Sequence, residues 1–302
     1  MQIVHIDTGP EMRGGQYQVL LLLDGLAEGG YDQILLAKES SPLRQAAKVA
    51  GHHVCPATLY NVWRWSRLSN AVVHAHDARA HTLAALVPGI RLVVSRRVAF
   101  PLKRSVPSRW KYGRAKRYLA VSCFVRDVLI SSGIPPAKVD VVHDGVELPS
   151  ADASWSVEGP VVALASSDPG KGRDLMQQAA ALAEVDVLYS GDLLRDLRRA
   201  SMFVYLTRSE GLGSAALLAM SRGVPVIASR VEGLAEVFIH NESGLYVRNN
   251  AEEVAGAIRR LRNDRELARC LAQGGRARIE ERFTKEHMVN GTIGAYKRVL
   301  AP

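Results

Sequence analysis

Residues 209 to 236 read Ser-Glu-Gly-Leu-Gly-Ser-Ala-Ala-Leu-Leu-Ala-Met-Ser-Arg-Gly-Val-Pro-Val-Ile-Ala-Ser-Arg-Val-Glu-Gly-Leu-Ala-Glu, and this stretch decides the fold. The apolar residues 202–206 before it predict a β-strand, Gly211 and Gly213 predict a tight turn, and the Ala/Leu/Met-rich run that follows predicts an α-helix. A second strand is predicted at 224–228, which completes a βαβ unit. In such a unit the glycines let a ligand approach the backbone, and the helix N-terminus presents unpaired N–H groups to it. The stretch therefore predicts a place to hold phosphate, although periodicity alone also allows a buried βαβ unit without a ligand.

The spacing of this stretch resembles the donor-site signature of retaining glycosyltransferase family 4, whose members have the GT-B fold and use nucleotide-sugars. The matching residues are Ser209-Glu210-Gly211-Leu212-Gly213, Ala219-Met220, Gly223-Val224-Pro225-Val226-Ile227-Ala228-Ser229, Gly233-Leu234 and Glu236. The ordered run of glycines, proline and carboxylates favours this resemblance over an ordinary βαβ unit.

The resemblance implies a role for several of the matched positions. The carboxylate of Glu210 is expected to hold hydroxyls of the donor sugar, and the amides of Gly211, Leu212, Gly213 and Ser214 are expected to face the diphosphate. Glu236 is carried over as a further donor-binding residue. The family has a second glutamate, eight residues after the first, which holds the ribose, but this chain has Leu218 there. The residues expected to bind the sugar and the phosphates are present, whereas the glutamate expected to hold the ribose is absent.

Length and composition predict two globular domains and make several other classes of protein improbable. A chain of 302 residues with 47% hydrophobic content is long enough for two cores of about 150 residues each. Its three cysteines, Cys55, Cys123 and Cys270, are far apart and form no Cys-x-x-Cys pair, so a disulfide framework or a structural metal is not expected. No signal-peptide pattern and no long apolar run is found. We expect a cytoplasmic protein, with peripheral attachment to the inner face of the cell membrane as an open alternative.

The first half of the chain alternates strand and helix patterns, which predicts an α/β fold with a parallel sheet covered by helices on both faces. It opens with a strand at 2–7, and Gly14 and Gly15 lead into a helix that ends near Gly29. A strand, a glycine pair and a helix can cradle phosphate, but the same pattern also makes a tight connection. In the family this loop approaches the donor, so the resemblance makes Gly14 and Gly15 donor-loop candidates. The strands and helices expected after it are 34–36, 43–50, 71–73, 79–86, 92–94, 124–130 and 139–142.

His74 and His76 follow one of these strands, and ligands of open parallel sheets bind at the carboxyl ends of strands. Residues at i and i+2 point to the same side of a strand, so metal chelation has to be considered. We do not favour it, because no third nitrogen or sulfur ligand follows at a recognisable spacing. The resemblance instead places His76 beside the donor sugar and leaves His74 as a structural histidine.

The net charge of +9 is concentrated in the first half of the chain. Residues 1–150 carry 19 Lys/Arg against 11 Asp/Glu, and residues 151–302 carry 20 against 19. Ten of the basic residues lie between 91 and 117, interleaved with Phe100, Trp110, Tyr112 and Tyr118, and no acid occurs between Asp77 and Asp127. The pattern favours an anionic acceptor or an anionic membrane surface over a merely solvated face, and it favours nucleic acid least.

The second half opens after a polar, proline-bounded linker at 147–160. Lys171, which precedes a glycine, resembles the family's lysine that neutralises the donor diphosphate. Ser166-Ser167 stand where the family has glycine and arginine, so Arg173 and Arg208 are considered as alternative substitutes. Between Lys171 and Ser209 we expect only a strand at 185–189, a helix at 193–200 and a strand at 202–206, one strand and one helix fewer than the family has. The second domain is therefore predicted to be a reduced version of the family's.

These observations predict a GT-B protein of two Rossmann-like domains. Residues 1–149 form an acceptor-side domain, residues 150–284 form a nucleotide-sugar donor domain, and the helix at 285–302 crosses back to the first domain. The resemblance implies transfer of a sugar, with retention of configuration, from a nucleoside diphosphate sugar to a glycan or lipid-linked acceptor, as in cell-envelope polysaccharide or lipopolysaccharide biosynthesis.

Stabilisation of the leaving diphosphate is the physical requirement of such a reaction, and a helix N-terminus with cations meets it without metal. No Asp-x-Asp pair is present, so neither a metal nor another cofactor is expected. Lys171 would carry the phosphate, Glu210 and His76 would orient the sugar, and the departing phosphate would take the acceptor's proton. Two alternatives remain open: a relative that binds without turnover, and a GT-B nucleotide-sugar epimerase.

Overall fold

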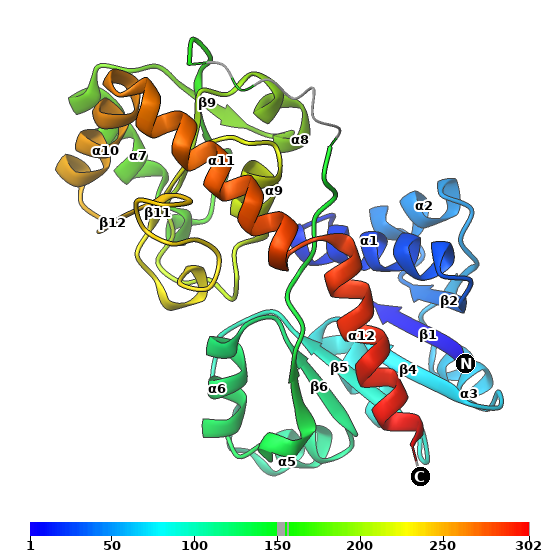
Figure 1. Cartoon of the computed structure of the whole chain (residues 1–302). Coiled ribbons are helices and arrows are strands. Elements are labelled where there is room, and N and C mark those ends of the chain that lie inside the picture. The colour runs from blue at the N-terminus through cyan, green and yellow to red at the C-terminus, as the bar shows by residue number, and fades with distance from the viewer. Residues whose placement is uncertain (150–154, 156, 302) are drawn as a thin grey trace. The chain divides into compact units, whose positions relative to one another are not determined.

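The computed structural model describes residues 1–149, 155 and 157–301, and it separates into two compact units (Figure 1). Unit 1 comprises Met1–Gly145 and Lys285–Pro302, and unit 2 comprises Val146–Thr284. The sequence places the boundary at 149/150, four residues later. The linker expected at 147–160 lies partly outside the described residues.

Unit 1 is built on a seven-stranded, wholly parallel sheet in the order β3-β2-β1-β4-β5-β6-β7. Its strands are β1 (Gln2–Asp7), β2 (Asp32–Ala37), β3 (Val54–Pro56), β4 (Ala71–Ala75), β5 (Leu92–Arg96), β6 (Arg117–Ala120) and β7 (Val139–Val141). Its helices are α1 (Gly14–Glu28), α2 (Pro42–Val49), α3 (Leu59–Ser66), α4 (Ala78–Ala85), α5 (Val106–Gly113), α6 (Cys123–Ser131) and α12 (Lys285–Leu300), with a short 3-10 turn at Pro136–Lys138.

The last helix, α12, packs beside α1 against this sheet (Figure 1). Ile3, Val72 and Val93 project from neighbouring strands into one apolar cluster with Leu22 of α1 and Tyr296 of α12. All five side chains are fully or almost fully buried. Because a buried aliphatic side chain contributes about 1.5–3 kcal/mol relative to an exposed one, this cluster fixes both helices on the sheet.

Unit 2 is built on a five-stranded parallel sheet in the order β12-β11-β10-β8-β9. Its strands are β8 (Val161–Leu164), β9 (Val187–Ser190), β10 (Met202–Tyr205), β11 (Val226–Ser229) and β12 (Leu245–Val247). Its helices are α7 (Arg173–Ala183), α8 (Leu193–Asp196), α9 (Ser214–Ser221), α10 (Ala251–Asn263) and α11 (Arg265–Arg282), with 3-10 turns at Pro169–Lys171, Leu197–Arg199 and Glu232–Leu234. The βαβ unit expected between residues 202 and 228 is confirmed as β10, α9 and β11.

Five elements differ from the sequence interpretation. Helix α5 and strand β6 lie between the strand expected at 92–94 and the helix expected at 124–130, where no element was expected. Strand β3 and helix α3 were not expected, because three strand residues and an aromatic-rich helix give only a weak periodic signal. Helix α7 was also missed, although Met176, Ala179, Ala180 and Ala183 are spaced as one buried helical face. The segment between Lys171 and Ser209 therefore contains one helix more than the sequence interpretation allowed.

Within the described residues, every helix is too short or too polar to cross a lipid bilayer.

Candidate donor site

One face of the unit 1 sheet carries a layered set of polar side chains toward the carboxyl ends of its strands. Side chains alternate along a strand, so His5 and Asp7 project on the same face as Ile3. Strand register pairs His5 with His74 on the neighbouring strand, and His76 follows on that face. The apolar layer under α1 and α12 thus gives way to a histidine layer just before the strands end.

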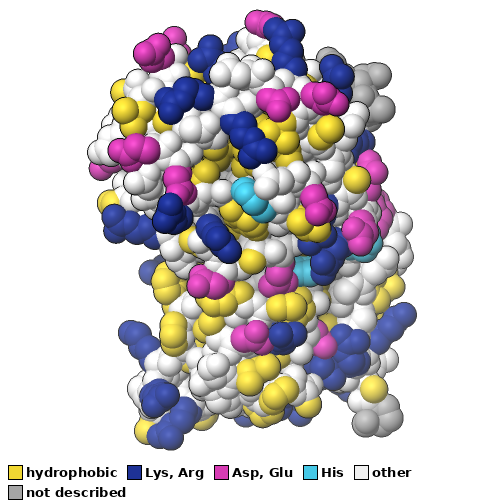
Figure 2. Space-filling view, turned by 60° about the vertical axis from the view of Figure 1, so that its left-hand side comes forward, with side chains coloured by type: hydrophobic (Ala, Val, Ile, Leu, Met, Phe, Trp, Pro, Cys, Tyr) yellow, Lys and Arg dark blue, Asp and Glu magenta, His cyan; other side chains and the backbone are white. Residues whose placement is uncertain are grey.

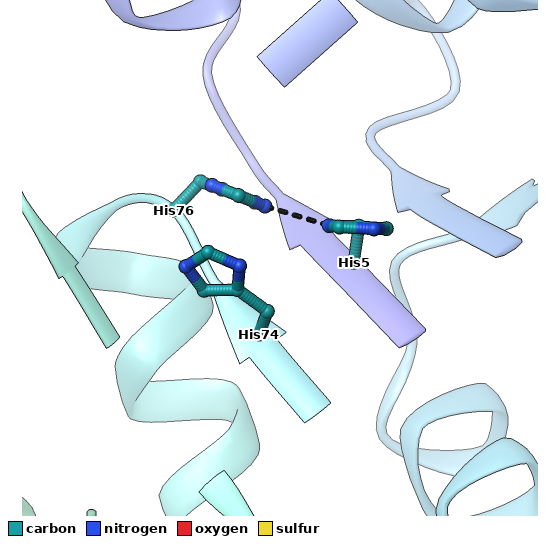
Figure 3. Close-up of side chains that lie close together, drawn as sticks. All are labelled: His5, His74 and His76. Carbon is teal, nitrogen blue, oxygen red and sulfur yellow. Dashed lines mark hydrogen bonds between the residues drawn. The ribbon is translucent and has the colours of Figure 1, made fainter. Parts of the chain in front are cut away.

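The three histidines form a buried, hydrogen-bonded cluster (Figure 3). Nδ1 of His5 lies 3.0 Å from Nε2 of His76, and the two rings are stacked with centroids 5.2 Å apart. His74 is bonded through Nδ1 to the hydroxyl of Tyr296 at 2.6 Å and through Nε2 to the hydroxyl of Ser95 at 2.8 Å. His74 is therefore satisfied by structural partners, whereas His76 lies at the outer end of the cluster.

Burial keeps these rings neutral. It lowers the pKa of His5 to about 3 and the pKa of His74 and His76 well below the ordinary value, with the neighbouring histidines as smaller causes. A neutral imidazole has one N–H donor and one bare acceptor nitrogen, so each ring can donate one hydrogen bond and accept one.

His5 corrects the sequence argument against a metal. That argument relied on the lack of a third nitrogen, but His5, His74 and His76 each have a ring nitrogen within 4.8 Å of the others. The third nitrogen comes from β1, 69 residues before His74, so no local spacing reveals it. The closest pair of nitrogens lies at hydrogen-bond distance, and both nitrogens of His74 have hydroxyl partners. This arrangement is that of a hydrogen-bonded chain, and the absence of a metal stays a prediction.

The glycine loop before α1 is held by a buried carboxylate. Asp7 accepts hydrogen bonds from the amide of Gly9 at 2.9 Å and from the side chain of Gln16 at 3.1 Å. Burial and the nearby Asp77 raise the pKa of Asp7. Gly14 is the first residue of α1 and is exposed, and Gly15 follows it. The loop that the sequence assigns to the donor is thus a fixed turn.

Arg97 lies next to this loop. Its Cδ would be 3.9 Å from a Cβ added to Gly15, and its Nε donates to the buried carboxylate of Asp144 at 3.0 Å. Its buried Nη1 has no hydrogen-bond partner among the described residues. After burial and the neighbouring histidines, its charge also lowers the pKa of His74 and His76, so Arg97 lies near the loop and the histidine cluster and not on a solvated face.

Lys171 and Glu210 come together in unit 2 as an ion pair. Lys171 Nζ and the hydroxyl of Tyr205 both donate to Oε1 of Glu210, and Nζ lies 3.4 Å from that hydroxyl. The side chains of Lys171 and Glu210 retain 27% and 15% of their exposure, so the pair is accessible from solvent. Burial, followed by the charge of Glu210, raises the pKa of Tyr205 well above its ordinary value, so this tyrosine remains a donor.

Backbone geometry at three glycines positions the pair. Gly172 has φ +65°, and a Cβ there would lie 2.6 Å from Cβ of Leu206. Gly213 has φ +98° and serves as the N-cap of α9. A Cβ at Gly233 would collide with the carbonyl oxygen of Glu210. These glycines let the turns after β8 and β10 approach each other closely.

The other predicted donor residues of unit 2 lie on the segments that follow β8, β10 and β11. Gly211 and Leu212 are buried, Ser214 opens α9, and Leu218 is partly exposed on the same helix. Arg173 opens α7, with its guanidinium 5.1 Å from the ring centre of Tyr189. The carbonyl of Glu236 accepts from Arg278 at 3.0 Å. His76, Gly14 and Gly15 lie in unit 1, and each unit is described by itself.

Two family profiles match the chain. The one described as Glycosyltransferase Family 4 matches residues 12–149, and the one described as Glycosyl transferases group 1 matches residues 171–278. The chain belongs to the group 1 glycosyltransferases.

Curated relatives match mainly in part of the chain. An uncharacterized glycosyltransferase of Methanocaldococcus jannaschii is 35% identical over 104 residues, which cover 34% of this chain and 29% of the relative. A lipopolysaccharide core biosynthesis glycosyltransferase, LpsD, of Rhizobium meliloti is 33% identical over 107 residues, or 35% of this chain and 31% of the relative. The chain thus spans less than a third of the length of these relatives.

Solved structures match the whole chain. The crystal structure of Anabaena Alr3699/HepE in complex with UDP and glucose has a TM-score of 0.82 at 14% identity and covers 99% of this chain and 100% of that chain. A likeness at this identity shows the fold alone. Together with the two parallel sheets, it confirms the α/β, two-domain GT-B fold expected from the sequence.

The ten basic residues between 91 and 117 fall into two groups. Arg96, Arg97, Lys111, Arg114 and Arg117 are bound to carbonyls or carboxylates of unit 1. Arg91, Lys103, Arg104, Arg109 and Lys116 are exposed. Lys103, Arg104 and Arg109, together with the exposed Phe100, Val106 and Trp110, form what we call the basic surface. At the level of α5, the lower end of Figure 2 shows Lys and Arg side chains beside hydrophobic ones.

Sequence reasoning missed four residues of the candidate site: His5, Asp7, Arg97 and Tyr205. Asp7 ends a strand next to a glycine loop, which is a usable signal. Tyr205 is the last residue of the strand before Glu210. Because side chains alternate along a strand, its position in β10 could have indicated which sheet face it lies on. His5 and Arg97 depend on strand register and on a side-chain ion pair, which a single sequence does not reveal.

Proposed function

We propose that this glycosyltransferase transfers a sugar from a nucleoside diphosphate sugar to a glycan or lipid-linked acceptor, with retention of anomeric configuration. The observation that carries the proposal is the cluster of Lys171, Glu210 and Tyr205 at the carboxyl ends of β8 and β10, beside the glycine turn into α9. Ligands of open parallel sheets bind at such ends. A cation, a carboxylate and a helix N-terminus in one place can hold phosphate and sugar hydroxyls together.

Each group has a defined task in this scheme. Departure of the diphosphate spreads negative charge, which Lys171, once it exchanges Glu210 for the phosphate, and the amides from Gly211 to Ser214 would hold. Glu210 would accept hydrogen bonds from sugar hydroxyls, and Tyr205 would keep its carboxylate oriented. The departing phosphate would take the proton of the acceptor hydroxyl as the new glycosidic bond forms on the face that the leaving group vacates.

Release of nucleoside diphosphate from a panel of nucleotide-sugars tests the proposal. We expect one donor to be hydrolysed slowly without acceptor, and the product released first to keep the donor's anomeric configuration by NMR. UDP-glucose is the first member of the panel, because HepE is solved with UDP and glucose. Binding of the matching nucleoside diphosphate at a hundredfold excess over its Kd should add about 2.7 kcal/mol to stability.

The two alternatives give different outcomes in the same panel. A relative that binds without turnover would show the stabilisation but no release of nucleoside diphosphate from any donor. An epimerase would change the configuration of the sugar that is recovered, and product analysis separates it at once. If no nucleoside diphosphate shifts the melting curve even at millimolar concentration, the donor site is misassigned.

The acceptor is proposed to be presented at an anionic membrane surface. On the basic surface, Phe100 and Val106 are 65% and 69% exposed and Trp110 is 48% exposed, beside Lys103, Arg104 and Arg109. Aromatic rings with basic neighbours suit the interface of anionic lipid, where each cation contributes about 1 kcal/mol. A membrane is favoured because these exposed rings and cations all lie within residues 100–110.

Vesicle co-sedimentation tests the membrane proposal. Changing Lys103, Arg104 and Arg109 together to Gln should weaken binding to anionic vesicles roughly a hundredfold, and less at high salt. Changing Arg259, Arg260 and Arg262 of α10 to Gln removes the same charge from unit 2 and should leave vesicle binding unchanged. Unaltered vesicle binding with a raised acceptor KM would instead indicate a phosphorylated soluble glycan. Loss of donor hydrolysis would place the surface at the donor site.

A further inference from the structure

A cleft lined by basic side chains lies at the amino-terminal edge of the unit 1 sheet, and the scheme above gives it no part. Its volume is about 520 Å³, which falls within the range of small-molecule sites in proteins. Four of its ten lining residues are basic, Arg91, Arg114, Lys116 and Lys138, and none of the ten is acidic. We call this feature the basic cleft.

The sheet brings three of these cations together. Arg91, Lys116 and Lys138 are the residues immediately before β5, β6 and β7. These strands are parallel neighbours, and adjacent strands lie about 4.8 Å apart, so the residues before them form a row along one edge of the sheet. His76 lies at the opposite edge. Because β5 has five residues with a rise of about 3.3 Å each, the two edges are at least about 13 Å apart.

The charges of this row are not neutralised within the protein. Arg91 and Lys116 are exposed, Lys138 is partly exposed, and their side chains form no hydrogen bond or ion pair with any residue that the structure describes. Asp140 is the acid that follows Lys138 most closely in the chain. Its carboxylate is already paired with two other side chains, Arg117 at 3.1 Å and Arg298 at 2.9 Å.

Two helix ends offer another explanation for these cations. Helix α4 ends at Ala85 and α5 ends at Gly113, and both residues line the cleft. A helix C-terminus carries roughly half a negative charge, so the two ends offset about one of the four positive charges. Arg114 supplies such a contact, since its Nη2 donates to the carbonyl of Val87 at 3.2 Å. About three positive charges are left facing one cleft, where they repel one another.

We propose that the basic cleft binds a diphosphate group, at a site separate from the donor site. A terminal diphosphate carries up to about three negative charges near neutral pH, which matches the charge left in the cleft. The guanidinium of Arg91 can bind phosphate oxygens in pairs, and the two lysines can act as point charges. A free diphosphate and the headgroup of a lipid-linked diphosphate both offer this chemistry. The inference does not depend on the proposed sugar transfer.

Calorimetric titration with inorganic pyrophosphate at low salt tests the proposal. Lys171→Ala is the starting protein, because it lacks the cation that the donor site would use, and we expect it to bind pyrophosphate. Changing Arg91, Lys116 and Lys138 together to Gln in this background should raise Kd at least about tenfold. High salt should also raise Kd, because it screens the cations. Absence of pyrophosphate binding in Lys171→Ala would overturn the proposal.

The basic surface supplies the matched control. Changing Lys103, Arg104 and Arg109 to Gln in the same background removes three charges from the same unit and should leave Kd unchanged. Equal losses in the two triple variants would show that pyrophosphate responds only to net charge, and this result would overturn the proposed site.

A substitution that keeps all the cations gives a second test. Gly113 lines the cleft, and no described atom lies within 4 Å of a Cβ added there. Gly113→Glu should therefore place a carboxylate among the cations and weaken pyrophosphate binding severalfold relative to Gly113→Gln, which has the same shape without the charge. Equal Kd values for these two variants would contradict binding in the cleft.

Thermal unfolding separates a ligand site from compensation of the helix ends. If the cations repel one another, the variant with Arg91, Lys116 and Lys138 changed to Gln should have a higher Tm than its parent at low salt, and the difference should shrink at high salt. If they stabilise the ends of α4 and α5, its Tm should fall. A lower Tm with an unchanged pyrophosphate Kd would assign the three residues to the helix ends and overturn the proposal.

Vesicles distinguish the two sources of diphosphate. Phosphatidylcholine vesicles with and without a polyprenyl diphosphate are compared by co-sedimentation. Binding that needs the diphosphate lipid and is lost in the cleft variant would indicate a lipid headgroup, whereas binding of pyrophosphate alone would indicate a free diphosphate. Either result supports the proposal, and failure to bind both pyrophosphate and the diphosphate vesicles overturns it.

Discussion

In unit 1, His76 lies at the end of a chain of neutral buried rings, whereas in unit 2 Lys171 and Glu210 face each other as a half-buried ion pair. In the neutral cluster, Nε2 of His5 and Nδ1 of His76 are buried without a hydrogen-bond partner among the described residues, so a ligand that reaches either nitrogen breaks no existing bond. The ion pair satisfies both of its charges internally, so a diphosphate has to compete with Glu210 for Lys171. The first arrangement is organised before the ligand arrives, and the second is organised by exchange of partners.

Lowering the pH should have the largest effect, because it should destabilise unit 1 through the histidine cluster. His5, His74 and His76 have ordinary pKa values near 6.5 when unfolded and lowered values when folded, with His5 at about 3. Below pH 6.5 the unfolded chain binds protons that the folded chain does not, so stability falls as pH falls. The loss approaches about 1.4 kcal/mol per pH unit for each ring. The pH range over which this stability is lost begins near 6.5 and, for His5, ends at about 3.

Tryptophan fluorescence can follow this loss in unit 1. Three of the four tryptophans, Trp63, Trp65 and Trp110, lie there, and Trp155→Phe removes the signal of the fourth. Urea unfolding at about pH 7.5 and about pH 5 should differ by several kcal/mol in this variant. His5→Leu should have a shallower pH dependence by one proton. A flat stability between these two values would mean that the rings are not held neutral.

Breaking the ion pair should give unequal results for its two members. Lys171→Ala removes a charged partner of the phosphate and should weaken nucleoside diphosphate binding by about 1.5–3 kcal/mol. Glu210→Gln keeps the shape but releases Lys171 from its partner, so free nucleotide should bind at least as well while the sugar-linked donor binds less well. Calorimetric titration with the nucleotide and with the donor measures both. Equal losses of nucleotide affinity in the two variants would contradict the exchange of partners.

Leu218 tests how far unit 2 keeps the family's donor site. Its partly exposed position on α9, one turn after the glycine turn, leaves room for a longer polar side chain. If a ribose docks there, Leu218→Glu should tighten nucleotide binding by about 1.5 kcal/mol through a charged hydrogen bond. Leu218→Gln is the control for shape, and circular dichroism confirms the fold. Weaker binding with the fold intact would mean that the pocket has been rebuilt around the leucine.

The two regions also differ in how far the sequence predicts them. In unit 2 the chemistry lies within one motif, so Glu210 and the turn into α9 could be found by spacing, and Lys171 by resemblance. Their mutual contact could not, because it depends on how closely the turns at Gly172 and Gly233 approach. In unit 1 His76 is hydrogen-bonded to His5, which becomes its neighbour only through the register of two parallel strands. Short β3 and helix α7 were missed for simpler reasons, a weak pattern in one case and an overlooked helical face in the other.

Chelation should have the smallest effect, and it sharpens the comparison by asking whether the histidine cluster is a hydrogen-bonded chain or a metal site. Three imidazoles are a sufficient set of protein ligands for Zn²⁺, so the presence of His5, His74 and His76 within 4.8 Å has to be tested. In the hydrogen-bonded chain, however, the proton between His5 and His76 occupies the place where a metal would bind. We therefore expect treatment with EDTA to leave Tm and donor hydrolysis unchanged, and added Co²⁺ to give no tetrahedral absorption. His74→Gln serves as the control for adventitious binding elsewhere, since it removes one of the three ligands. A fall in Tm on chelation that Zn²⁺ reverses in the unaltered protein, but not in His74→Gln, would show that the cluster is a metal centre and contradict the hydrogen-bonded arrangement of His5 and His76.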